Sequence, residues 1–106
     1  MICVNTSEIA GYKITESLRL VTGNVVQSKH IGRDIMAGLK TIIGGEITGY
    51  TALLSEARFD AQKRMEMEAQ KIDADAIINI RYTTSAISQG MSELLAYGTA
   101  VKIEKL

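Results

Sequence analysis

Among the side chains of the types that bind metal ions, which are one cysteine, one histidine and scattered carboxylates, three are the candidates to test. They are Cys3, which is the one cysteine, His30, which is the one histidine, and Asp34. A protein metal site needs several such donors that converge on one point. The chain has no C-x-x-C, H-x-x-x-H or D-x-D-x-D-G spacing to bring donors together locally. We expect no complete metal site within one subunit, whereas a site shared between subunits stays open because symmetry multiplies each ligand.

Nucleophilic catalysis could use Cys3 or a serine, with His30 as the base. A single cysteine in a strand near the terminus is typical of a small buried apolar side chain. Nothing in the spacing brings His30 beside it, and the sequence has no G-x-S-x-G nucleophile elbow. Asp73 and Asp75 resemble an acid/base pair, but a turn that ends a helix explains both. We therefore expect no catalytic residue and a protein that is not an enzyme.

Length and composition narrow the class of protein further. The 106 residues suit a single domain over residues 1–106, and 46% hydrophobic with 23% charged residues exclude a disordered chain. Twelve Lys+Arg balance twelve Asp+Glu, so no net field attracts nucleic acid or an anionic membrane. No apolar run approaches the ~20 residues of a membrane span, and the first residues do not form a signal peptide. The single cysteine fits a reducing compartment, so we expect a cytoplasmic protein.

Apolar residues alternate with polar residues at both ends of the chain, which predicts strands. The predicted strands cover Met1–Thr6, Tyr12–Ser28, Ala76–Thr84 and Glu93–Ile103. Gly23 interrupts the second of these, which indicates a bulge or a bend. The alternation places Ile14, Leu18 and Leu20 on one face of the second strand. It places Ile78, Ile80 and Tyr82 on one face of the third.

The period becomes helical in the middle of the chain. A short helix is predicted from Gly32 to Ile43, ended by Gly44-Gly45, and a long helix from about Gly49 or Tyr50 to Ile72. Arg64 is spaced for ion pairs with Asp60 and Glu68 on the solvated flank of the long helix. The order of elements predicts an α+β fold, with an antiparallel or mixed sheet from the terminal strands covered by both helices. The apolar row of the long helix consists of Leu54, Ala57, Ala61, Met65, Ala69 and Ile72.

The long helix also carries a second apolar surface. Phe59, the only Phe, lies about 140° around the helix from Leu54, with Ala52 within about 20° of it and Met67 about 80° further round. A single sheet beneath the helix cannot bury both surfaces. Phe59 is then either half exposed or part of a subunit interface, and we favour the interface because a thin core gains from association. Phe59, Met67 and Ala52 are the predicted interface residues.

Several short motifs in a fixed order resemble those of the YbjQ-like family of small uncharacterised prokaryotic proteins. The resemblance covers essentially the whole chain. It departs from the family at Asp73, where a glycine commonly stands. The motifs are Gly11-x-x-Ile14-x-Glu16, Val21-Thr22-Gly23, Arg33-Asp34-Ile35, Gly44-Gly45, Gly49-Tyr50, Ala74-Asp75-Ala76-Ile77-Ile78 and Gly98-Thr99-Ala100-Val101.

The resemblance implies a dodecin-like α+β subunit that assembles as a homopentamer. It also carries the family label "putative heavy-metal-binding domain", which implies a heavy-metal ion as the ligand. The first hypothesis is therefore a non-enzymatic homo-oligomer that binds a small ligand or a metal ion between subunits, with Cys3, His30 and Asp34 as the residues to test. The alternative is a structural or partner-binding oligomer without a small-molecule ligand.

Overall fold

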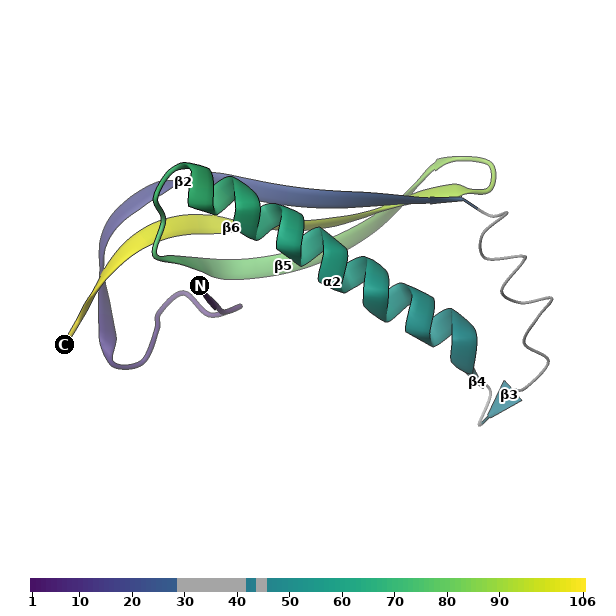
Figure 1. Ribbon diagram of the computed structural model, residues 1–106, viewed down its shortest axis with the longest axis horizontal. Coiled ribbons are helices and arrows are strands. Elements are labelled where there is room, and N and C mark those ends of the chain that lie inside the picture. Colours follow the sequence, from purple (N-terminus) through teal and green to yellow (C-terminus); the bar gives the residue numbers. More distant parts are fainter. Residues whose placement is uncertain (29–41, 44–45) are drawn as a thin grey trace.

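The computed structural model describes residues 1–28, 42–43 and 46–106 of the chain. It contains one helix among these residues and several strands (Figure 1). In chain order the elements are β1 (Ile2–Cys3), β2 (Tyr12–Ser28), β3 (Ile42–Ile43), β4 (Glu46–Ile47), α2 (Thr48–Lys71), β5 (Ala76–Ser88) and β6 (Met91–Lys105).

Four of the strands form one mixed sheet in the order β1-β5-β6-β2. β1 runs parallel to β5, and the other neighbouring pairs are antiparallel. β2 and β6 pair along nearly their whole length, from Tyr12 opposite Lys105 to Ser28 opposite Met91. The prediction of an α+β fold whose sheet is built from the terminal strands is confirmed.

Helix α2 covers one face of this sheet and lies mainly over β2 and β6. Its C-terminal half crosses the strands, whereas its N-terminal end lies beyond them (Figure 1). Four residues of the predicted apolar row are buried against the sheet, and Leu54, nearer the N-terminal end, is 36% exposed. The predicted long helix is confirmed to within two residues at each end. The buried row consists of Ala57, Ala61, Met65 and Ala69.

Small residues on both sides allow α2 to approach β2 closely. The row on the helix is mostly alanine, and Gly23 of β2 lies beneath it. A Cβ atom added to Gly23 would collide with the backbone carbonyl oxygen of Ala61 and the backbone nitrogen of Met65. Gly23 is therefore needed for the close helix–strand contact, which is one of the roles that a glycine inside a strand can have.

A bulge in β5 moves side chains from one face of the sheet to the other. The register shifts between Ile78 and Arg81, and Asn79 has a positive φ of 53°. Ile80 consequently packs beneath α2, whereas Ile78 packs on the opposite face. The prediction that Ile78 and Ile80 share a face is wrong, because an extra residue in a strand breaks its period of two.

β2 contains two register shifts, and the second restores the alternation of faces that the first reverses. They lie between Ile14 and Glu16 and between Ser17 and Arg19. Leu18 packs against the helix-side core and Ile14 against the opposite one, while Leu20 is 63% exposed. The predicted common face for these three residues is therefore wrong, and the buried residue after the bulges is Val21.

The N-terminal segment follows the bulge of β5 and covers part of the second face of the sheet. The N–H of Val4 donates to the carbonyl of Ile77 at 3.0 Å, and the N–H of Asn79 donates to the carbonyl of Thr6 at 3.0 Å. Ile9 then packs into a small second core. The predicted first strand, residues 1–6, is shortened to Ile2–Cys3 because the chain beyond it bonds to the bulged backbone. The other buried members of this core are Ala76, Ile78 and Val101.

The predicted short helix lies mostly outside the described residues, which exclude 29–41 and 44–45. Its predicted last residues, Ile42 and Ile43, form β3, which pairs with β4 in antiparallel register. For these two residues the helical prediction is wrong. β-Branched isoleucines favour strands, and a Gly-Gly pair between two such segments is typical of a hairpin.

Helix α2 ends in a Schellman motif, in which the residue after the helix is left-handed. Asp73 has a φ of 57°, the N–H of Ala74 donates to the carbonyl of Ala69, and the N–H of Asp73 donates to the carbonyl of Gln70. Asp73 therefore adopts the backbone conformation that glycine favours.

The molecule is long and flat. Its extents are 51 × 29 × 17 Å, and its radius of gyration is 16.8 Å, whereas a compact domain of this length would have about 13 Å. Among the helices that the structure describes, none combines the length and the apolar character needed to cross a membrane. Among the described residues, one helix covers the elongated four-stranded sheet, and several large apolar side chains are exposed.

Candidate functional site

The strongest group of chemically active side chains lies around Cys3. β1 pairs with β5 so that Cys3 stands beside Ile77, and its side chain packs against the core beneath α2. Gln62 and Glu66, one helical turn apart on α2, lie close enough to the thiol to influence its pKa. Three segments far apart in the sequence therefore meet here, namely β1, α2 and β5.

Tyr82 completes this group from β5. Its hydroxyl donates to Oε1 of Gln62 at 2.8 Å, and Nε2 of Gln62 donates to Oε2 of Glu66 at 3.5 Å. Tyr82 stands on the helix side of the sheet because it lies two residues after Ile80, beyond the bulge. We call these four residues, Cys3, Gln62, Glu66 and Tyr82, the Cys3 cluster.

The environment of the cluster keeps the thiol protonated. Burial and then the negative charge of Glu66 raise the pKa of Cys3 from 9.0 to about 11, although the N-terminal ammonium opposes this shift. Burial also raises the pKa of Tyr82, with the charge on Cys3 as the next contribution and Arg58 opposing it. At pH 7 roughly one thiol in ten thousand is ionised, since each pKa unit changes the ratio tenfold.

This protonation state bears directly on what Cys3 can do. A catalytic cysteine needs a lowered pKa and a nearby cation or base, because the thiolate is the nucleophile. Here the carboxylate of Glu66 raises the pKa of the thiol, which is the opposite direction. The geometry disfavours Cys3 as a nucleophile at neutral pH.

The Cys3 cluster contains two of the donor types that a metal site uses. Cys3 and Glu66 supply one thiol and one carboxylate, and a structural zinc-type site takes four donors. Within residues 1–28, 42–43 and 46–106, no three or more His, Cys, Asp or Glu side chains are placed so that they could hold a metal ion. Of the metal candidates taken from the sequence, Cys3 belongs to this cluster, while His30 and Asp34 lie outside the described residues. The described residues of one chain therefore do not complete a metal site.

Sequence reasoning missed the partners of Cys3. Gln62 and Glu66 were visible as an i,i+4 pair on the predicted helix, and such pairs share a face. What the sequence did not show was the parallel pairing of β1 with β5, which brings Cys3 to that face. The position of Tyr82 on the helix side of the sheet depends in addition on the bulge at Asn79.

The predicted interface residues lie on the outer surface of α2. Phe59 is 60% exposed and Met67 is 57% exposed, and Ala52 is also exposed. Nζ of Lys63 lies 5.4 Å from the centre of the Phe59 ring, a cation–π contact that partly shields the ring. Phe59 lies midway in sequence between the buried residues Ala57 and Ala61. Two positions on a helix correspond to about 200° of rotation, so Phe59 lies on the side opposite to both. It therefore points away from the sheet.

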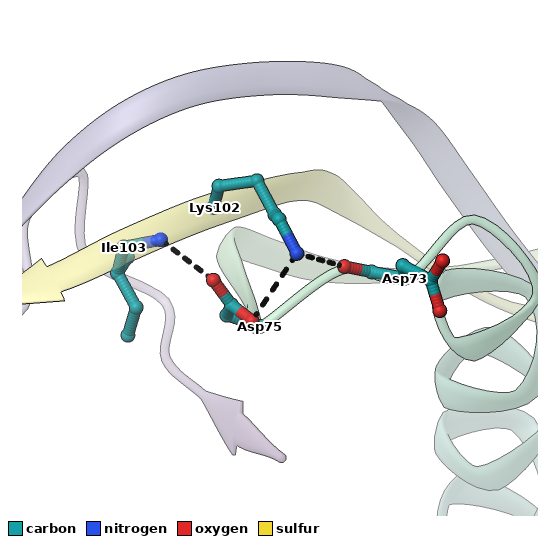
Figure 2. A network of polar contacts seen from close by, with 4 residues as sticks. All are labelled: Asp73, Asp75, Lys102 and Ile103. Atoms are coloured by element: carbon teal, nitrogen blue, oxygen red, sulfur yellow. Dashed lines mark hydrogen bonds and ion pairs between the residues drawn. The ribbon is translucent and has the colours of Figure 1, made fainter.

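The two aspartates after α2 have a structural role (Figure 2). Oδ2 of Asp75 accepts a hydrogen bond from the N–H of Ile103 at 3.0 Å. Nζ of Lys102 donates to the backbone carbonyl of Asp73 at 2.7 Å and lies 3.6 Å from Oδ1 of Asp75. Both aspartates join the end of the helix to β6, as expected for a turn and not for an acid/base pair.

Comparisons with known proteins agree with this fold. The family described as "putative heavy-metal-binding" matches residues 1–104. A UPF0145 protein from Photobacterium profundum is 67% identical over 103 residues, which are 97% of this chain and all of the relative. A UPF0145 protein from Thermotoga maritima is 56% identical over 106 residues and covers both chains completely.

A solved structure resembles the fold at low sequence identity. It is a protein of unknown function from Pediococcus pentosaceus that is assigned to the DUF74 family. The TM-score is 0.64 at 18% identity, with 98% of each chain covered, so the likeness concerns the fold alone. The match over residues 1–104 and the identity to the UPF0145 proteins show that this chain belongs to the YbjQ-like family.

Proposed function

We propose that this protein is a non-enzymatic, cytoplasmic homo-oligomer, and that a second copy of the chain covers the outer surface of α2. The observation that carries this proposal is the exposure of Phe59 and Met67, 60% and 57%, on the side of the helix that faces away from the sheet. Burial of these two side chains by a partner would stabilise the complex, by roughly 25 cal/mol for each Å² of apolar surface that is removed from water.

The shape and charge of the chain support self-association. The sheet is long and has one covering helix in the described structure, so the domain buries a small core for its length. The formal net charge is zero, so no overall repulsion opposes the approach of identical copies. The dodecin-like pentamer implied by the family resemblance is the assembly that we expect.

The mass of the untagged protein in solution tests this proposal. Light scattering after size-exclusion chromatography would give about 58 kDa for a pentamer, which is five times 11.5 kDa. Phe59→Ser combined with Met67→Ser should shift the mass toward the monomer. Leu106→Ser is the matched control, because Leu106 is 82% exposed at the end of the chain. A wild-type mass of one chain at micromolar concentration would overturn the proposal.

A second function, binding of a heavy-metal ion between subunits, has its own support. The thiol of Cys3 faces the carboxylate of Glu66, and the family carries a heavy-metal description. A thiolate ligand favours soft or borderline ions such as zinc or copper(I). Cys3 and Glu66 would supply two donors, and residues of a neighbouring subunit would supply the others.

Elemental analysis tests the metal proposal separately from the assembly. The protein should be purified without an affinity tag or a chelator, because both change metal content. We expect stoichiometric metal in the wild type, and loss of it in Cys3→Ser and in Glu66→Gln. Glu68→Gln is the control, since Glu68 lies on the same helix and pairs with Lys71. Sub-stoichiometric metal in the wild type under every growth condition would overturn this proposal.

The alternative is an oligomer that serves a structural or partner-binding purpose without a small-molecule ligand. It predicts the multimeric mass together with the absence of stoichiometric metal. The two measurements therefore separate the metal-binding oligomer from the ligand-free oligomer.

A further inference from the structure

β2 is an outer strand of the sheet. Among the described residues it pairs on one side with β6, and the strand order places no neighbour on its other side. An outer strand offers a row of backbone N–H and C=O groups to which a strand of another chain can bind. At 17 residues, β2 is also much longer than the short outer strands that limit such pairing.

The sequence of β2 favours pairing with another copy. Residues 20–28, LVTGNVVQS, contain no charged side chain and no proline. Segments of this kind, with high β-propensity and low net charge, pair readily with identical strands. Leu20 and Val26 are 63% and 48% exposed, so part of the segment is accessible in the folded chain.

Arg64 of α2 lies across this segment. Its Nη1 donates to the backbone carbonyl oxygen of Asn24 at 2.6 Å, a contact between residues 40 apart in the sequence. Because Gly23 lets the helix backbone approach β2, the Arg64 side chain is held over the middle of the uncharged segment. The predicted ion pairs of Arg64 with Asp60 and Glu68 are wrong, since Arg64 contacts the strand and Glu68 pairs with Lys71 at 3.0 Å.

A charged side chain at this position has two effects on an approaching strand. It binds a backbone carbonyl of this outer strand, and it places a guanidinium where an uncharged strand would have to desolvate it. The lining of the groove between β2 and α2 at this point includes Arg19 on the strand side and Arg64 and Glu68 on the helix side, so both sides carry charge beside the uncharged residues.

We propose that Arg64 closes the outer edge of β2 against strand pairing with a second copy of this chain. Residues 20–28 are the surface that is protected, and their partner would be the same segment of another copy. This inference does not depend on the proposed oligomer, because it concerns species larger than the wild-type assembly, whatever mass that assembly has.

Three variants test the proposal, with mass and amyloid-dye fluorescence measured over time at several protein concentrations. Arg64→Ala should lose the single wild-type peak and form larger, concentration-dependent species that bind thioflavin T. Arg64→Lys should behave like the wild type, because it retains a charged donor. Arg58→Ala is the matched control, since it removes an arginine from the same helix whose hydrogen bond is to Ser55.

A rescue variant distinguishes edge pairing from simple unfolding. Thr22→Lys places a charge at an exposed position of the outer strand β2. The double variant Arg64→Ala with Thr22→Lys should therefore recover the wild-type peak. Far-ultraviolet circular dichroism before incubation checks that each variant is folded. The proposal is overturned if folded Arg64→Ala keeps the wild-type mass without dye binding, or if Arg58→Ala aggregates equally. Failure of the Thr22→Lys rescue would likewise contradict it.

Discussion

The carboxylate of Asp75 accepts a hydrogen bond from the backbone N–H of Ile103 at 3.0 Å, 28 residues further along the chain (Figure 2). This N–H lies two residues beyond Val101, which pairs with Ala76 at the start of β5. The side chain of Asp75 thus accepts the hydrogen bond of a β6 backbone N–H just before β5 begins at Ala76. Lys102 stands beside it and binds the end of the helix.

Replacing Asp75 should weaken the connection between the helix end and β6. We expect Asp75→Ala to lower the free energy of unfolding by about 1–2 kcal/mol, since it removes a charge-assisted hydrogen bond and an exposed ion pair. Asp75→Asn should lose less because its amide oxygen can still accept. Urea denaturation would measure this, with the exposed Asp60→Ala as a control for charge. Equal losses in Asp75→Ala and Asp60→Ala would contradict the role of Asp75.

The protein should be more stable with glycine at position 73. The φ of 57° at Asp73 is costly for a residue with a Cβ atom, and its contact with Lys102 uses the backbone carbonyl, which glycine retains. We expect Asp73→Gly to raise the free energy of unfolding by about 0.5–1 kcal/mol, and Asp73→Ala to lower it. If both variants are destabilised alike, the Asp73 side chain has a role that the backbone conformation does not explain.

Gly23→Ala should be destabilising although the added group is a single methyl. The methyl would meet backbone atoms of Ala61 and Met65, which cannot rotate away as a side chain could. We expect a loss of about 1–3 kcal/mol, measured as a lower midpoint of thermal or urea unfolding. Thr22→Ala, an exposed change on the same strand, is the control. A stability for Gly23→Ala equal to the wild type would show that the helix is farther from β2.

The reactivity of Cys3 should depend steeply on pH. The rate of alkylation by iodoacetamide should rise through a midpoint of about 11 in the folded protein and about 9.0 in urea. Because the folded-state pKa is the higher one, the contribution of the thiol to stability is complete below about pH 9. It is lost as the pH rises through about 11.

Glu66→Gln separates the contribution of the carboxylate to the Cys3 pKa from that of burial. It removes the negative charge beside the thiol, so it should lower the pKa of Cys3 and speed alkylation at pH 8. Glu68→Gln, which removes a charge from the same helix at a distance from the thiol, should not. A midpoint near 9 in the folded wild type would mean that Cys3 is neither buried nor close to Glu66.

The sequence alone determined the helices and strands in which apolar side chains recur at a regular, uninterrupted spacing. The row from Ala57 to Ala69 has a spacing of four residues, so the length and the buried face of α2 followed from it. The strands of the sheet and the α+β class were likewise predictable, because hydrophobic burial selects local periods of 3.6 and 2. The turn at Asp73 and Asp75 was correctly assigned for the same local reason.

Only the tertiary structure decided which residues meet across the fold. One extra residue at Asn79 reverses the faces of the β5 residues directly after it, and the register shifts in β2 place Leu18 on the face opposite to Ile14; no local pattern reveals either. Cys3 reaches Glu66 and Arg64 reaches Asn24 because strand pairing and the close approach at Gly23 bring distant segments together. Contacts of this kind depend on the sum of many packing interactions, so they are properties of the folded chain and not of a short segment.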